Sequence, residues 1–77
     1  MNIKEKTIKV ISELTPQNKI NNDSRLVEDL GIDSLNMVLL LINIETAFSF
    51  SLKEEDMNPY KLVTVNDVIL LVKRYYE

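Results

Sequence analysis

The sequence contains neither histidine nor cysteine, and it has one glycine and two prolines among its 77 residues. Without cysteine, a disulfide framework and a thiolate metal site are excluded. Without histidine, the usual zinc ligand and the usual general base near neutral pH are missing as well. The acidic cluster Glu54–Asp56 lacks the alternating spacing and central glycine of a calcium loop, so we predict no metal site. Because a Gly-x-Ser-x-Gly elbow is also absent, we predict that the chain is not an enzyme.

Long hydrophobic runs are absent too. The longest run, Met37–Ile42, is too short to span a bilayer, and residues 1–6 mix charges in a way that does not fit a signal peptide. The composition is nevertheless 45% apolar, which is enough for one modest core. We therefore expect residues 1–77 to form a single domain, monomeric and cytoplasmic, with no membrane span.

The charges are distributed unevenly along the chain. Residues 23–56 carry eight acids and two bases, whereas the segments on either side are each slightly basic. Nucleic acid is disfavoured as a partner because phosphate binding needs basic clusters, and a basic protein surface is favoured instead. An ordinary solvated acidic face fits this distribution equally well.

The apolar residues recur at helical spacing in three stretches, at about residues 2–14, 34–48 and 64–75. Asp33 is placed to cap the second helix, and Thr64 with Asp67 resembles a capping box for the third. No stretch shows sustained two-residue alternation, so we predict an all-α fold. It would be a small helical bundle of three main helices plus a short irregular or helical segment.

Two connections separate these helices. Residues 15–33 are rich in polar residues and contain a proline and the single glycine, which predicts a long loop. Four apolar residues could pin this loop to the core: Ile20, Leu26, Val27 and Leu30. The segment Lys53–Leu62 contains Pro59, so at most short helical turns fit there.

The second helix has two apolar stripes on opposite sides. We assign one stripe to the core: Met37, Leu40, Leu41, Ile44 and Phe48. The other consists of Leu35, Val38, Leu39 and Ile42. A surface helix needs only one stripe, so the helix is either buried all round or exposes the second stripe to a partner. We favour the exposed stripe, because small exposed apolar patches tend to mark binding sites.

Ser34 stands at the start of this helix, directly after the predicted cap. The surrounding block reads Leu26-Val27-Glu28-Asp29-Leu30-Gly31-Ile32-Asp33-Ser34-Leu35. It resembles the signature of the acyl carrier proteins, Asp-Leu-Gly-x-Asp-Ser-Leu before an apolar helix. The resemblance extends over essentially the whole chain, since length and order of elements also match.

The resemblance implies that Ser34 carries 4′-phosphopantetheine through a phosphodiester, installed from coenzyme A by a phosphopantetheinyl transferase. The thiol of this arm would hold an acyl group as a thioester, so the chain needs no cysteine of its own. Asp33 would help the transferase to place its metal and substrate. Acyl-loading and acyl-processing enzymes would read the helix through Leu35, Asn36, Val38, Leu39, Ile42 and Glu45.

The chain departs from the family in the charge of that helix. Asn36, Leu39, Thr46 and Ala47 stand where fatty-acid carriers commonly have acids, and only Glu45 remains. This difference favours a specialised polyketide or peptide-type pathway over housekeeping fatty-acid synthesis. The alternative hypothesis is an unmodified module that binds an amphipathic helix through the stripe beginning at Leu35.

Overall fold

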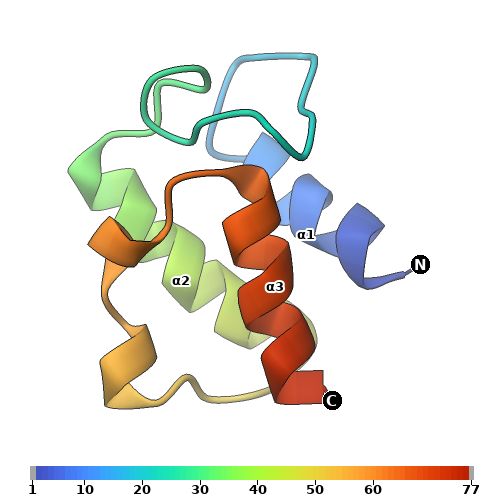
Figure 1. Ribbon diagram of the computed structural model, residues 1–77, viewed down its shortest axis with the longest axis vertical. Coiled ribbons are helices and arrows are strands. Elements are labelled where there is room, and N and C mark those ends of the chain that lie inside the picture. Colours follow the sequence, from blue (N-terminus) through green and yellow to red (C-terminus); the bar gives the residue numbers. More distant parts are fainter. Residues whose placement is uncertain (1, 77) are drawn as a thin grey trace.

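The predicted all-α architecture is confirmed by a computed structural model of the protein, which describes residues 2–76. Three α-helices, α1 (Ile3–Ser12), α2 (Ser34–Phe48) and α3 (Val65–Tyr76), pack around one core (Figure 1). Two 3₁₀ turns, η1 (Glu54–Asp56) and η2 (Pro59–Lys61), lie between α2 and α3. Within the described residues, the only β-type pairing is an isolated antiparallel bridge between Arg25 and Thr64.

The ends of the helices follow from local capping. Asn2 caps α1 by accepting a hydrogen bond from the Glu5 amide, and the helix ends at Ser12, two residues before the predicted end. There the amides of Glu13 and Leu14 bond to carbonyls three residues back, which tightens the last turn into 3₁₀ geometry. Leu14 nevertheless packs against the core from outside the helix.

The capping box predicted for α3 is present. The Asp67 amide donates to the Thr64 hydroxyl at 3.3 Å, while the Asp67 carboxylate accepts from the amides of Thr64, at 3.0 Å, and Val63, at 2.9 Å. These backbone hydrogen bonds hold the pKa of the Asp67 carboxyl below its usual value, because they stabilise the charged form. The two residues that precede α3, Val63 and Thr64, are thereby both bonded to one carboxylate.

The hydrophobic core lies between the three helices and reaches into both connections. The core stripe predicted for α2 is buried, as are all five apolar positions of α3 that face inward. Among residues 2–76, the buried apolar residues are Val10, Ile11, Leu26, Leu30, Ile32, Met37, Leu40, Leu41, Ile44, Phe48, Leu52, Leu62, Val65, Val68, Ile69, Leu71 and Val72.

The long loop is anchored to the core by a different set of residues from the one predicted. Leu26 and Leu30 are buried and Ile20 is partly buried, but Val27 is exposed, so its assignment to the core was wrong. Ile32 takes the remaining place and is completely buried. Residues 26–30 form a tight turn rather than a helix, so spacing along the sequence does not tell which side chains face inward.

The loop is also tied to the start of α3 by backbone hydrogen bonds. The Leu26 amide donates to the Val63 carbonyl at 2.8 Å, and the Val65 amide donates to the Ser24 carbonyl at 3.0 Å. Loop 15–33 therefore runs across the end of the bundle from which α2 begins, as its path in Figure 1 shows. This arrangement fixes the residues that lead into Ser34.

Candidate functional site

Ser34 occupies the first position of α2 and is exposed. Asp33 is the cap, as predicted: its carboxylate accepts a hydrogen bond from the Asn36 amide at 2.8 Å. The first amides of a helix have no intrahelical carbonyl to pair with, so this end of α2 presents donors and a positive dipole end. An ester of phosphate on the serine would be electrostatically favoured here.

The approach to Ser34 depends on one glycine and one buried anchor. Gly31 has a φ of +68°, in the left-handed region that costs other residues energy. The next residue, Ile32, is completely buried, and its amide donates to the Leu26 carbonyl at 3.0 Å. The turn at Gly31 thus allows Ile32 to enter the core while Asp33 and Ser34 stay at the surface.

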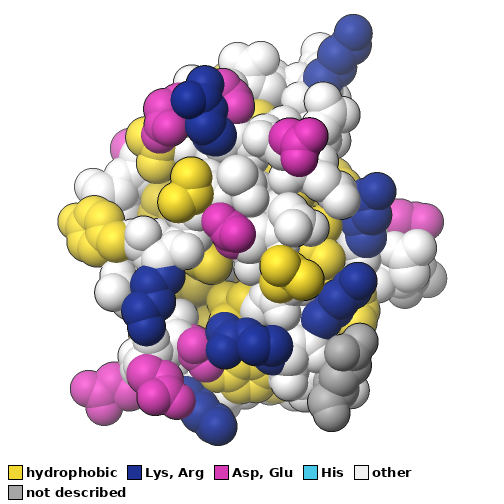
Figure 2. All heavy atoms as spheres, in the orientation of Figure 1, with side chains coloured by type: hydrophobic (Ala, Val, Ile, Leu, Met, Phe, Trp, Pro, Cys, Tyr) yellow, Lys and Arg dark blue, Asp and Glu magenta, His cyan; other side chains and the backbone are white. Residues whose placement is uncertain are grey.

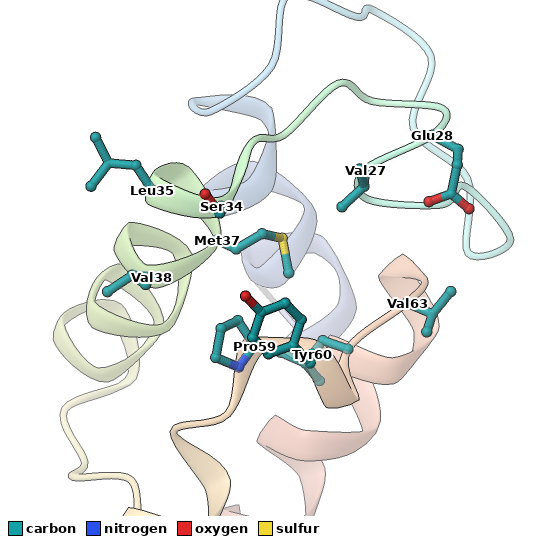
Figure 3. Close-up of a pocket in the computed structure, with 10 residues that line it drawn as sticks. Val27, Glu28, Ser34, Leu35, Met37, Val38, Pro59, Tyr60 and Val63 are labelled. Carbon is teal, nitrogen blue, oxygen red and sulfur yellow. The ribbon is translucent and has the colours of Figure 1, made fainter.

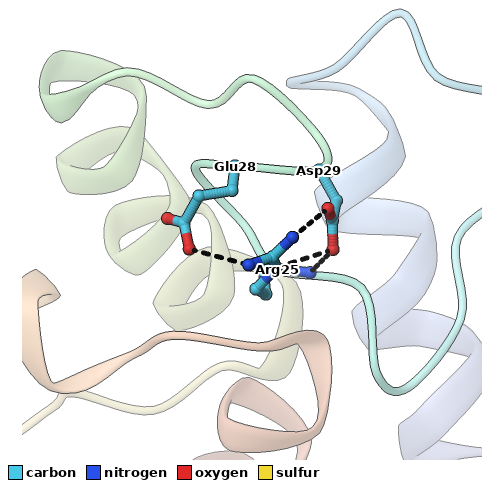
Figure 4. Close-up of polar contacts among 3 residues, drawn as sticks. All are labelled: Arg25, Glu28 and Asp29. Atoms are coloured by element: carbon cyan, nitrogen blue, oxygen red, sulfur yellow. Dashed lines mark hydrogen bonds and ion pairs between the residues drawn. The ribbon is translucent and has the colours of Figure 1, made fainter.

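The Arg25 side chain also stabilises this loop. The Arg25 guanidinium forms two hydrogen bonds to the Asp29 carboxylate and an ion pair with Glu28 at 3.7 Å (Figure 4). The side-chain hydrogen bond raises the pKa of Arg25 and lowers the pKa of Asp29. Asp29 additionally accepts from the Arg25 amide at 2.8 Å. Arg25, the single arginine of the loop, thus stabilises the turn before Gly31 through its contacts with Asp29 and Glu28.

An apolar groove of about 710 Å³ opens beside Ser34. One wall consists of the first turns of α2, and the facing wall consists of Pro59 and Tyr60 of η2 with the residues that follow (Figure 3). Met37 lies between Ser34 and Pro59 in this view. The lining residues are Val27, Glu28, Ser34, Leu35, Met37, Val38, Pro59, Tyr60, Leu62 and Val63.

This groove was not predicted from the sequence. Its second wall comes from the segment Lys53–Leu62 and the residue after it, where we predicted short helical turns but assigned no functional residue. Helical turns are indeed present there, with Pro59 at the first position of η2. Tyr60 is 86% exposed and lines the groove together with Ser34. The sequence could not predict this, because neither periodicity nor a motif relates Tyr60 to Ser34.

The second stripe of α2 is exposed, as favoured from the sequence. We call Leu35, Val38, Leu39 and Ile42 the α2 apolar surface; their exposed fractions lie between 40% and 70%. Asn36, on the flank, is half-buried. The α2 apolar surface adjoins the groove, because Leu35 and Val38 line both.

Charge is scarce on α2. Glu45 is the only charged residue of this helix, and its carboxylate accepts a hydrogen bond from the Leu52 amide at 2.7 Å. By contrast, the face viewed in Figure 2, with α3 in front, carries basic and acidic side chains in a mixed pattern. The contribution of Glu45 to a partner interface stays a prediction, but its carboxylate has a structural partner within the chain.

Two further features of the described residues bear on the site. No group of three or more acidic residues, in an arrangement that could hold a metal ion, occurs among residues 2–76. The described helices are all too short or too polar to cross a bilayer.

Comparison with known proteins identifies the family. Residues 5–72 match the family described as "Phosphopantetheine attachment site". The chain is similar to an acyl carrier protein of Rickettsia bellii, with 37% identity over 76 residues, covering 96% of this chain and 86% of the relative. An acyl carrier protein of Desulforapulum autotrophicum is 34% identical over 77 residues, covering 96% and 97%. One of Chlamydia felis is 40% identical over 55 residues, covering 71% and 68%.

These matches span nearly the whole chain, and they do not favour the alternative of an unmodified helix-binding module. They agree with an exposed serine at a helix start and a neighbouring apolar groove. The chain therefore belongs to the acyl carrier protein family, whose members are non-catalytic carriers with a covalently attached 4′-phosphopantetheine.

Proposed function

We propose that this protein carries acyl groups on a 4′-phosphopantetheine arm attached to Ser34. The observation that carries the proposal is the exposure of Ser34 at the capped start of α2, beside an apolar groove. The arm would supply the thiol that holds the acyl group as a thioester, since the chain has no cysteine. The hydroxyl of Ser34 would hold the phosphate, and the free amides and dipole at the helix start would favour its negative charge.

The residues around Ser34 fit such a group. The groove is lined mostly by apolar side chains, so an apolar chain beside Ser34 would lose contact with water there. Asp33 is exposed and bonds to the Asn36 amide, and its carboxylate remains at the surface next to the serine. In our proposal a phosphopantetheinyl transferase uses Asp33 to place its metal and substrate.

We further propose that residues 1–77 act as a single domain, monomeric and cytoplasmic. All described helices share one hydrophobic cluster, which supports a single domain. The absence of cysteine suits a reducing compartment.

Acyl-loading and acyl-processing partners would dock on the α2 apolar surface and its flanks at Asn36 and Glu45. The four apolar side chains of this surface are exposed beside the attachment residue, so a partner seated there would also reach Ser34. Because α2 carries a single charged residue, Glu45, docking would rely on apolar contact more than on attraction to a basic partner face. This supports a specialised polyketide or peptide-type pathway more than fatty-acid synthesis.

The attachment is tested by incubating the protein with coenzyme A and a broad-specificity phosphopantetheinyl transferase. Intact mass should increase by one phosphopantetheine in the natural protein and in Ser51→Ala, and should stay unchanged in Ser34→Ala. Ser51 is a suitable control because it is an exposed serine in the connection after α2. Incorporation into Ser34→Ala would show that the arm is attached elsewhere. No incorporation into the natural protein with several such transferases would contradict the proposed function.

A further inference from the structure

The wall of the groove that faces α2 has two parts, which are anchored in different ways. At its far end, Val63 accepts one backbone hydrogen bond from the Leu26 amide, and its own amide donates to the Asp67 carboxylate. On the η2 side, the backbone–backbone hydrogen bonds of residues 53–62 all lie within that segment, as far as the described residues show. The position of the η2 wall must therefore be set by side chains.

We infer that Tyr75 is a positioning residue, which fixes the segment 53–62 and thereby holds the η2 wall of the groove beside Ser34. Tyr75 lies near the end of α3, on a different element from either wall. The inference about the wall rests on the structure alone. Its consequence for bound cargo rests on the proposed function.

The Tyr75 hydroxyl makes two hydrogen bonds to the first turn of this segment. It donates to the Asp56 carboxylate and accepts from the Lys53 amide at 2.8 Å. Its ring stacks on Phe50, with 4.8 Å between ring centres and 14° between planes, so the hydroxyl is held in place from behind. One phenol thus connects both ends of the turn that contains η1.

Arg74 supports the same carboxylate at 3.2 Å, but its side chain is 64% exposed. An exposed ion pair contributes little by itself, because solvent screens it and its side chain must be ordered. The Asp56 side chain is only 14% exposed, so it needs a partner inside the fold. The hydrogen bond from Tyr75 is accordingly the first cause of the lowered pKa of Asp56.

One contact links η1 to η2, and a second holds η2 to the residue before it. The Lys61 ammonium donates to the Glu55 carbonyl at 3.4 Å, and Asn58 caps η2 by accepting from the Tyr60 amide at 3.0 Å. The segment ends at Leu62, which is buried in the core and also lines the groove. Pro59 and Tyr60 therefore lie between an end held by the core and an end held by Tyr75.

The test compares Tyr75→Phe with Tyr76→Phe. Each removes one hydroxyl and keeps the ring, but the Tyr76 hydroxyl donates to the Phe48 carbonyl at 2.6 Å, outside segment 53–62. Hydrogen exchange should accelerate by about fivefold or more at residues 53–62 in Tyr75→Phe, because two hydrogen bonds to this segment are lost, and should stay unchanged there in Tyr76→Phe. Equal exchange in this segment for both variants would overturn the inference. Asp56→Asn is a second variant that weakens the same contact without removing the ring.

The consequence for cargo is tested on protein that carries phosphopantetheine and an octanoyl thioester. Release of the octanoyl group by hydroxylamine should be faster in Tyr75→Phe than in the natural protein and in Tyr76→Phe. If hydrogen exchange at residues 53–62 accelerates only in Tyr75→Phe but octanoyl release is unchanged, the wall does not shelter the thioester. That result would overturn this part of the inference. If the natural protein accepts no phosphopantetheine, the proposed function fails, whereas hydrogen exchange still decides the role of Tyr75.

Discussion

Replacing Leu39 with glutamate should change the free energy of unfolding only slightly but should strongly weaken docking of a partner on α2. Leu39 belongs to the α2 apolar surface and is 40% exposed, whereas its neighbour Leu40 is completely buried. Complete burial of a leucine side chain is worth about 1.5–3 kcal/mol, and about three fifths of Leu39 is covered. A glutamate at this position can extend its carboxylate into water. We therefore expect Leu39→Glu to lower the free energy of unfolding by about 1 kcal/mol.

Thermal unfolding followed by circular dichroism measures this change. For a domain of this size, about 1 kcal/mol corresponds to a melting temperature about 4–8 °C lower. Leu40→Ala creates a cavity in the core and should cost about 2–5 kcal/mol. A Leu39→Glu variant that is destabilised as much as Leu40→Ala would refute the assignment of the exposed stripe.

Docking is measured on the same variant as the rate of phosphopantetheine transfer at low substrate concentration. Leu70→Glu is the matched control, because Leu70 is 50% exposed but lies on α3. If docking is apolar, Leu39→Glu should slow transfer by about tenfold or more, the loss expected for a residue near the centre of an interface. Leu70→Glu should leave the rate nearly unchanged, and the natural protein should respond little to added salt. Faster transfer to Leu39→Glu, or a steep fall with salt, would contradict apolar docking.

The remaining predictions concern the loop and the pH dependence of stability. Gly31→Ala should lower the free energy of unfolding by about 1–2 kcal/mol in denaturant titrations, because an added Cβ meets no atom within 4 Å and only the backbone conformation at φ +68° is unfavourable. Asp29, Asp56 and Asp67 have pKa values below the usual value because they accept hydrogen bonds, so the unfolded chain binds more protons in acid. Their contribution is present above the unfolded pKa of about 3.9 and is lost as pH falls through the lower folded values. The melting temperature should therefore decline below about pH 4, less steeply in Asp67→Ala, and a rise on acidification would contradict this sign.

The helices and their caps could be predicted because the signals are local. Asp33 and the Thr64–Asp67 pair stand within four residues of the amides that they cap. The two stripes of α2 could be separated because a helix has a fixed period, and the stripe that contains Phe48 leads on to Phe50 in the aromatic cluster beside the core. Ser34 was singled out by its place at this helix start and by the surrounding block.

The full set of inward-facing residues of the loop, the groove and the contact of Tyr75 could not be predicted, because they depend on contacts between residues distant in sequence. Val27 was assigned to the core and is exposed, because the turn at 26–30 has no period that would predict its inward side. The groove needs residues of α2, the loop and η2 together. The hydroxyl of Tyr75 meets Asp56 across 19 positions of sequence, and neither residue belongs to a motif. Such pairs become visible only once the helices are packed.

The scarcity of charge on α2 has a consequence for a cell that contains several carriers. A helix of 15 residues with a single carboxylate, that of Glu45, gives less long-range attraction to a basic enzyme surface than a helix with several acids would. Encounters with enzymes that find their carriers by charge should then be slow, even though the serine and its arm are chemically the same. We expect α2 to insulate this carrier from other acyl pathways at the stage of first encounter, before any active site selects among cargoes.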